Sequence, residues 1–314
     1  MQENILVSIR CLTYNHEAFI RQCLEGFIMQ KTNFKFEAII HDDASTDNSA
    51  TIIKEYASKY PDIIKPILET ENQYSKHDGS LSRIMNAAVA STAKYIAYCE
   101  GDDFWTDPYK LQKQVDILEA NPQVTMVYTG FQTINDQGQT IIRPAYEKFP
   151  LYSKTGCLFK ELLQSNFIMT LTVCIRKECL FSDIIQNTPS RLDHNLFLGA
   201  ASMGDLYYLP EKTGCYRQTT TGATATQQKQ IDNAIEKINT YYIIKFLTKK
   251  IKRHFTFKDN IHIRFIISSY FISLLLKRKK QLCKSIIKSD RYLYLFIIPG
   301  GIYKLVKKLQ KALD

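Results

Sequence analysis

The sequence contains no closely spaced pair of cysteines, and this absence removes two common classes of site. Its eight cysteines are scattered over 314 residues, and none stands in a Cys-x-x-Cys pair. Zinc sites and dithiol redox motifs are usually built on such pairs, so neither is predicted. Most of the cysteines stand in apolar runs, as Cys99 does, and we expect reduced, mostly buried thiols.

Two signals of membrane passage are also missing. The opening residues, MQENILVSIRC, include no basic segment followed by a long apolar stretch, so we expect a cytoplasmic protein without a secretory signal. Near the other end, the uncharged stretches 265–276 and 292–303 are each shorter than the roughly 18–20 apolar residues of a spanning helix. They better suit segments that lie in a membrane interface, with lysines on anionic headgroups.

Charge is distributed unevenly along the chain. The net charge is +10, but residues 245–314 carry 18 Lys and Arg against 3 Asp and Glu, which leaves the first 244 residues at −5. Such asymmetry points to an anionic partner for the tail. A nucleic acid is one alternative, but no RNA- or DNA-binding motif is present, and a membrane surface explains the charges and the apolar stretches together. A tail that packs on the body or on a second subunit is the other alternative.

The first 130 residues alternate between short apolar runs and helical patterns. Strands are predicted at residues 5–12, 36–40, 63–68, 94–99 and 124–133, with helices at 17–29, from Ser45 or Thr46 to about 60, at 81–90 and at 109–119. This alternation predicts an α/β fold with a mostly parallel sheet flanked by helices. Residues 150–220 are less regular. They predict helices at 158–163 and 193–203, an apolar run at 167–175 and a strand at 206–209, and they leave 211–217 unassigned.

Polar clusters follow three of the predicted strands directly, at residues 13–15, 42–43 and 100–103. In open α/β sheets the ligand binds beyond the carboxyl ends of the strands. The three clusters should therefore meet at one edge of the sheet and form an acidic crevice.

The cluster at 100–103, Glu-Gly-Asp-Asp, places three carboxylates within four residues. Carboxylates this close repel one another unless a cation or solvent compensates their charge. Mg²⁺ and Mn²⁺ take oxygen ligands of this kind, often one or two carboxylates together with phosphates. The alternative is a polar turn that caps the following helix. The second cluster, Asp42-Asp43, can likewise hold a ribose or base, or belong to a helix cap.

Three segments together resemble the start of a family 2 glycosyltransferase: VSIRCLTYNHEAFIRQCLEGFIMQ, FEAIIHDDASTDNSATII and KYIAYCEGDDFWTDPYKLQKQVDIL. The resemblance covers residues 5–130 strongly and 165–220 more weakly. It implies a fold of the GT-A type, in which a Rossmann-like sheet for the nucleotide is joined to an acceptor-binding part. It also implies inverting transfer of a sugar from a nucleotide-sugar to an acceptor hydroxyl, with Mg²⁺ or Mn²⁺ as cofactor.

The same resemblance assigns the nucleotide to the first two strand ends. Thr13, Tyr14 and Asn15 would line the nucleotide pocket. Asp43, together with Asp42, would hold the uracil or the ribose.

It assigns the cation and the sugar to the fourth strand end. Asp102 matches the metal-binding carboxylate of the D-x-D motif, and Glu100 stands at the first acid of that motif. Asp103 and Trp105 would face the sugar or the acceptor, although Trp105, the only tryptophan, is equally well explained as a core residue. Arg217 would belong to a loop over the diphosphate.

The catalytic base is expected near residue 193. An inverting transfer needs a carboxylate that deprotonates the attacking hydroxyl. In the family this base starts a helix that is followed by a Gly and a Tyr-Arg pair. Asp193, with Gly204 and Tyr216-Arg217 after it, matches that order. A helix-capping role for Asp193 and a base at Asp183 are the alternatives.

Together these features predict an enzyme of bacterial surface polysaccharide or lipopolysaccharide synthesis on the inner face of the plasma membrane. Residues 1–130 would bind the nucleotide-sugar, residues 131–228 would bind the acceptor saccharide or lipid-linked saccharide, and residues 229–314 would form a basic amphipathic helical tail. The tail would meet an anionic membrane through residues 245–314, and no nucleic acid partner is expected. A nucleotidyltransferase and a non-catalytic nucleotide- or carbohydrate-binding protein are the alternative functions.

Overall fold

The computed structural model describes residues 5–76, 80–187 and 193–219. The chain divides into two compact units, Met1–Leu158 with Phe167–Thr220, and Phe159–Asn166 with Thr221–Asp314. In the second unit the described part contains helix α7 (Phe159–Gln164), in which Phe159 and Leu162 are buried. The predictions for the basic tail at 229–314 lie outside the described residues.

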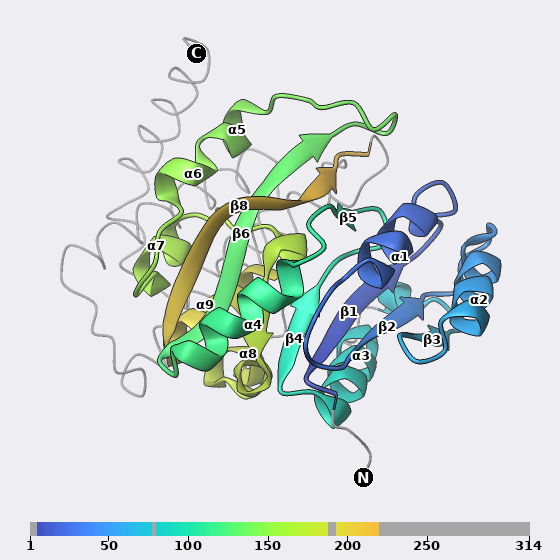
Figure 1. Ribbon diagram of the computed structural model, residues 1–314, viewed down its shortest axis with the longest axis horizontal. Coiled ribbons are helices and arrows are strands. Elements are labelled where there is room, and N and C mark those ends of the chain that lie inside the picture. Colours follow the sequence, from blue (N-terminus) through green and yellow to red (C-terminus); the bar gives the residue numbers. More distant parts are fainter. Residues whose placement is uncertain (1–4, 77–79, 188–192, 220–314) are drawn as a thin grey trace, which may run out of the picture. The chain divides into compact units, whose positions relative to one another are not determined.

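The first unit is built on an eight-stranded sheet with the strand order β3-β2-β1-β4-β7-β6-β8-β5 (Figure 1). The strands are β1 (Val7–Thr13), β2 (Phe36–Asp42), β3 (Ile64–Leu68), β4 (Tyr95–Tyr98), β5 (Phe104–Trp105), β6 (Val124–Ile134), β7 (Cys174–Arg176) and β8 (Asp205–Arg217). β3, β2, β1 and β4 run parallel to one another, as do β6 and β8. β7 is antiparallel to both β4 and β6, and β5 is antiparallel to β8. The predicted α/β fold with a mostly parallel sheet is confirmed.

Helices flank this sheet, and α1 and α4 pass in front of it in Figure 1. The helices of the unit are α1 (Ile20–Ile28), α2 (Ser49–Lys59), α3 (Ser80–Thr92), α4 (Lys110–Ala120), α5 (Pro144–Glu147), α6 (Phe149–Tyr152), α8 (Asp183–Asn187) and α9 (Asp193–Met203). Short 3₁₀ turns lie at Tyr74–Lys76, Thr170–Thr172 and Lys177–Phe181. Among the described residues, no helix combines the length and the apolarity that crossing a bilayer requires.

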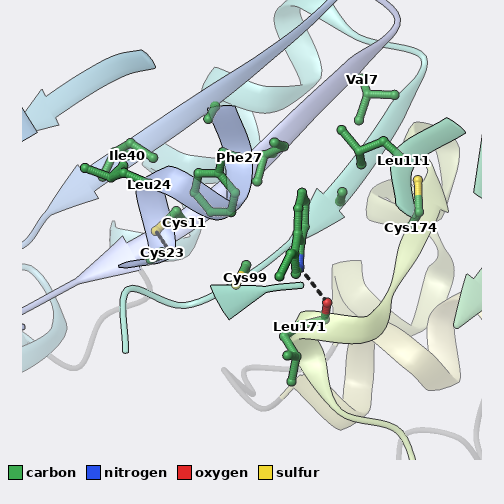
Figure 2. Close-up of a cluster of buried hydrophobic side chains, with 14 of the residues drawn as sticks. Val7, Cys11, Cys23, Leu24, Phe27, Ile40, Cys99, Leu111, Leu171 and Cys174 are labelled. Carbon is green, nitrogen blue, oxygen red and sulfur yellow. Dashed lines mark hydrogen bonds between the residues drawn. The ribbon is translucent and has the colours of Figure 1, made fainter. Parts of the chain in front are cut away.

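The core forms where α1 covers the centre of the sheet. Helix α1 buries Ile20, Cys23, Leu24 and Phe27, which recur at the spacing of one helical face. These side chains meet the buried residues of β1, β2 and β4 (Figure 2). Because β1 is a central strand that is covered on both faces, nearly all of its residues are buried, as expected for parallel strands.

Two boundaries differ from the predictions. β8 extends to Arg217 and so includes residues 211–217. The β-bulges between β6 and β8 interrupt the alternation of buried and exposed residues, so the sequence pattern did not identify this part of the strand. Helix α2 begins at Ser49 rather than near Ser45 or Thr46. Ser45 and Thr46 belong to the loop before the helix, where they are hydrogen-bonded to Asp42 and Asn15.

Candidate active site

The loops after β1 and β2 are bound to each other through Asn15 and Asp42. The Asn15 side-chain oxygen accepts the Thr46 backbone N–H at 2.8 Å, and the Asn15 N–H donates to the Ser45 hydroxyl at 2.9 Å. The carboxylate of Asp42 accepts the Ser45 N–H at 3.0 Å and its hydroxyl at 2.6 Å. Asn15 and Asp42 therefore fix the two loops to each other, and Tyr14, which precedes Asn15, is exposed.

Asp43 fixes a third loop at the same edge. Its two carboxylate oxygens accept the backbone N–H groups of Gln73 and Tyr74 at 2.7 and 3.0 Å. Its own N–H donates to the carbonyl of Thr13 at 2.9 Å, and both acid and threonine are buried. Asp43 thus connects the ends of β1 and β2 to the loop that follows β3.

One small cavity brings the predicted acids at positions 100 and 193 together. It has a volume of about 70 Å³, and its lining residues are Arg10, Leu12, Gln73, Tyr74, Leu81, Ser82, Glu100 and Asp193. Gln73 and Tyr74 are the residues that Asp43 holds. The cavity is therefore a meeting point of the ends of β1 and β4, the loop that Asp43 holds and the start of α9. The polar clusters after the strands predicted that the strand ends would meet at one edge of the sheet.

Glu100 is tied to β1 within this cavity. One of its carboxylate oxygens accepts the Leu12 N–H at 3.2 Å, and the other lies 3.7 Å from a terminal nitrogen of Arg10. Burial raises the pKa of Glu100 to about 8, Arg10 opposes the rise, and the charges of Asp193 and Asp102 add to it. The carboxyl group of Glu100 is therefore held beside the Arg10 cation, in surroundings that disfavour its ionised form.

Asp193 is the first residue of α9, and it is exposed to solvent. The hydroxyl of Thr170, at the start of a 3₁₀ turn, donates a hydrogen bond to the Asp193 carboxylate. Asp193 thus presents an exposed carboxylate in the lining of the cavity, and the Thr170 hydroxyl bonds to it.

Asp102 lies beside the cavity rather than in its lining. Its side chain is 24% exposed, and its Oδ2 atom lies 4.0 Å from the Nε2 atom of His16. Gly101 allows this approach, since a Cβ there would lie 2.4 Å from the Thr13 hydroxyl and 2.9 Å from the His16 ring. Within the described residues, no three His, Cys, Asp or Glu side chains are grouped to hold an ion. The accessible carboxylate of Asp102 is a donor of the kind that Mg²⁺ and Mn²⁺ take.

Asp103, expected to face the sugar or the acceptor, and Arg217, expected in a loop over the diphosphate, are both buried and bonded to other parts of the protein. Asp103 is 3% exposed and accepts the Arg217 backbone N–H at 2.7 Å. The Arg217 guanidinium is also buried, and it donates to the carbonyls of Asp102 at 2.9 Å and Asn135 at 3.1 Å and to the side-chain oxygen of Gln22 at 2.7 Å. These two residues hold the turn that carries Asp102.

Trp105 belongs to the core, contrary to the prediction that it faces the sugar. It is 2% exposed, and its indole N–H donates to the Leu171 carbonyl at 2.9 Å, the dashed line in Figure 2. The Phe27 ring packs edge-on against it with centroids 5.0 Å apart, and the Lys110 ammonium lies 4.5 Å from its centroid. The ring has no face left for a sugar.

Most residues of the cavity lining, and Thr170 beside it, were not predicted as site residues. Arg10 carried a signal, because a single charge inside an apolar strand needs a buried partner. Gln73 and Tyr74 carried none, since their position depends on backbone contacts with Asp43. Thr170 is one hydroxyl in an apolar run, and only the fold brings it to Asp193.

The family model for Glycosyl transferase family 2 matches residues 8–178, which include the strand ends described above. The chain belongs to glycosyl transferase family 2. A family relative of known donor is dTDP-rhamnosyl transferase RfbG of Shigella flexneri, 32% identical over 187 residues that cover 54% of this chain and 63% of RfbG. An uncharacterised protein of Mycobacterium bovis is 37% identical over 212 residues, which are 68% of this chain. The match spans 58% of that relative's length.

Solved structures confirm the GT-A type fold of this family 2 protein. Staphylococcus aureus TarS, residues 1–349 in complex with UDP-GlcNAc, aligns with a TM-score of 0.57 at 13% identity and covers 99% of this chain and 93% of that one. The mannosyltransferase PcManGT of Pyrobaculum calidifontis, in complex with GDP-Man and Mn²⁺, aligns with a TM-score of 0.54 at 14% identity over 98% of this chain and 89% of that one. At these identities the likeness establishes the fold alone.

Proposed function

We propose that this chain transfers a sugar from a nucleotide-sugar, with UDP as the carrier, to an acceptor hydroxyl with inversion at the anomeric carbon. The observation that supports this most directly is the cavity shared by Glu100 and Asp193. It lies at the carboxyl ends of β1 and β4, where open α/β sheets bind their ligands, and the exposed Asp193 carboxylate in its lining can take a proton. The two similar structures were solved with nucleotide-sugars, UDP-GlcNAc in TarS and GDP-Man in PcManGT, which supports a nucleotide-sugar donor.

Asp193 is the base in this proposal. The attacking hydroxyl loses its proton to the Asp193 carboxylate, and Thr170 holds that carboxylate in place. Arg10 keeps the charge of Glu100 balanced, so two acids can share one cavity. Tyr14, Thr13 and the loop held by Asp43 would receive the nucleoside.

A Mg²⁺ or Mn²⁺ ion, when bound, would neutralise the leaving diphosphate, and Asp102 would hold it. The accessible side chain of Asp102 and the absence of a protein cage around it among the described residues suit an ion shared with phosphates. PcManGT was solved with Mn²⁺ beside its donor. Glu100 is engaged by Leu12 and Arg10, so we place it with the donor sugar or ribose rather than on the ion.

The acceptor is proposed to be a saccharide or lipid-linked saccharide of bacterial surface polysaccharide or lipopolysaccharide. Relatives such as RfbG act on activated sugars, and the 18 basic residues after position 244 suit the inner face of an anionic membrane. The full chain should then bind phosphatidylglycerol vesicles and not phosphatidylcholine vesicles. Equal binding to both, or to neither, contradicts the membrane part of the proposal.

The activity is tested by incubating the purified chain with a panel of nucleotide-sugars and Mn²⁺. We expect one donor to raise the thermal midpoint in a metal-dependent way and to be hydrolysed slowly, with release of its nucleoside diphosphate. The absence of stabilisation and of hydrolysis with every UDP-, GDP- and dTDP-sugar contradicts the proposed function. Release of pyrophosphate from a nucleoside triphosphate and a sugar phosphate would instead indicate a nucleotidyltransferase.

A further inference from the structure

The cavity that Glu100 and Asp193 share is also lined by a nearly buried arginine, Arg10, which is 8% exposed. Its guanidinium carbon lies 5.5 Å from the centroid of the Tyr98 ring, and one of its terminal nitrogens lies 3.7 Å from a Glu100 carboxylate oxygen. The second distance is too long for a hydrogen bond, and within the described residues the Nε–H of Arg10 has no acceptor. Because a guanidinium held away from water needs acceptor oxygens, Arg10 is placed to receive one from a ligand.

The charges around Arg10 indicate which kind of ligand oxygen fits. Arg10 is the one cation among the lining residues that the structure describes, and two acids, Glu100 and Asp193, line the cavity with it. A carboxylate or phosphate oxygen placed here would compete with Glu100 for Arg10 and would be repelled by the Asp193 carboxylate. A neutral oxygen, from a carbonyl or a hydroxyl group, is therefore favoured.

Two leucines in the lining favour a carbonyl group that carries a methyl group. Leu12 lies near the end of β1, and Leu81 lies in the first turn of α3, which packs against β1. A hydroxyl group set against leucine side chains loses its hydrogen bonds to water, whereas a methyl group gains by leaving water. The cavity, of about 70 Å³, thus offers a hydrogen-bond donor, acceptor oxygens and an apolar wall made of Leu12 and Leu81.

We propose that this cavity binds the acetamido group of the donor sugar, so that the donor is a UDP-N-acetylhexosamine; this rests on the proposed function. The Arg10 guanidinium donates to the acetamido carbonyl, the acetamido N–H donates to a Glu100 oxygen, and the methyl group packs on the apolar wall. In such a sugar the acetamido group is attached to C2, next to the anomeric carbon. Its binding here places the reacting carbon near Asp193, which lines the same cavity.

Calorimetric titration of the full chain with Mn²⁺ tests this with two pairs of donors. UDP-N-acetylglucosamine is compared with UDP-glucose, and UDP-N-acetylgalactosamine with UDP-galactose, so that each pair differs only in the group on C2. We expect the wild type to bind at least one acetylated donor roughly tenfold or more tightly than its partner. A site that hydrogen-bonds a substituent rejects the analogue that lacks it, because its own polar groups are then left unpaired.

Two variants assign the preference to the cavity. In Arg10→Met the preference within each pair should disappear, while UDP without a sugar binds as it does to wild type. Arg21→Met is the matched control, because Arg21 is exposed and is not among the lining residues, and it should keep the preference. Leu81→Ser should reduce the preference by about tenfold through the lost methyl contact. Leu81 is only half-buried, so this variant tests the cavity even if Arg10→Met disturbs the fold.

The outcomes separate this inference from the proposed function. Equal affinities within both pairs, or a preference that persists in both Arg10→Met and Leu81→Ser, overturn the acetamido assignment. Tighter binding of a donor without an acetamido group, such as dTDP-rhamnose or GDP-mannose, overturns it as well and leaves the transfer of a sugar from a nucleotide-sugar intact. Absence of metal-dependent binding with every donor contradicts the proposed function itself, and this inference with it.

Discussion

The backbone N–H of Arg217 donates a hydrogen bond of 2.7 Å to the carboxylate of Asp103, and so joins the end of β8 to the turn that carries Asp102. The guanidinium of the same arginine donates to the Asp102 carbonyl at 2.9 Å. The position of the proposed cation ligand therefore depends on a residue that is more than one hundred positions away along the chain.

Removing the Arg217 side chain should weaken both the fold and the cation site. Arg217→Ala leaves several buried carbonyls without donors, and we expect the free energy of unfolding, measured with urea, to fall by about 3 kcal/mol. Mn²⁺-dependent UDP binding should weaken as well, because the Asp102 turn loses its support. Arg21→Ala, which removes an exposed ion pair with Glu55, should affect both far less. Equal effects of the two variants would contradict the proposed support of the fold and the cation site by Arg217.

Asp102→Asn should abolish metal-dependent binding of the donor. The amide keeps the shape of the side chain but loses the charge that attracts a divalent ion, so we expect transfer or donor hydrolysis to fall by about two orders of magnitude or more. Calorimetric titration with UDP, in the presence and absence of Mn²⁺, measures the loss. Asp62→Asn, an exposed acid before β3, is the control and should behave as wild type.

Asp193→Asn should separate chemistry from binding. General bases contribute roughly 10²–10⁴-fold to rate, so transfer should fall within that range while Mn²⁺-dependent UDP binding stays unchanged. The matched control is Asp183→Asn, since Asp183 also stands in the first turn of a helix and is exposed. Full transfer activity in the Asp193 variant, or a larger loss in the Asp183 variant, would remove Asp193 from the mechanism.

Substitution of Trp105 should change stability and not the affinity for the donor. Trp105→Ala opens a large cavity beneath α1 and should destabilise the fold by about 3–5 kcal/mol, whereas Trp105→Phe should cost less because it keeps a ring against Phe27. Urea unfolding measures both, and UDP affinity of the Phe variant should match wild type. A specific loss of donor affinity in Trp105→Phe, without a change in stability, would support the alternative that the Trp105 ring contacts the sugar.

Because of Lys110, the free energy of unfolding should depend on pH in the alkaline range. Burial lowers the pKa of Lys110 from 10.5 to about 8, although its ammonium donates to Gln114 at 2.5 Å. Between these pH values the unfolded chain binds more protons than the folded one, so folding becomes more favourable as pH rises. The stability of wild type relative to Lys110→Met should therefore increase by up to about 3 kcal/mol from pH 8 to pH 10.5. Parallel pH profiles of the two proteins would contradict the shifted pKa.

The parts of the fold that sequence predicts well are those that depend on local pattern. β1, β2 and β4 are apolar runs because they are covered on both faces, and the polar residues after them reveal which edge binds ligands. The positions of Asp103, Trp105 and Arg217 could not be predicted from sequence for a common reason. Each is a polar or amphipathic residue near the site, and whether it meets ligand or interior depends on contacts with distant segments. Local sequence does not record those contacts.

The spacing around Asp102 has one further consequence. Because a methyl group at position 101 would overlap the Thr13 hydroxyl and the His16 ring, any residue larger than glycine must displace these side chains or the loop that carries them. The spacing between Asp102 and the loop after β1, where the proposed ion would bind, thus depends on the missing side chain of Gly101. Engineering that aims to widen or narrow this spacing has to act on the two residues that approach Gly101, since the glycine itself admits no replacement of useful size.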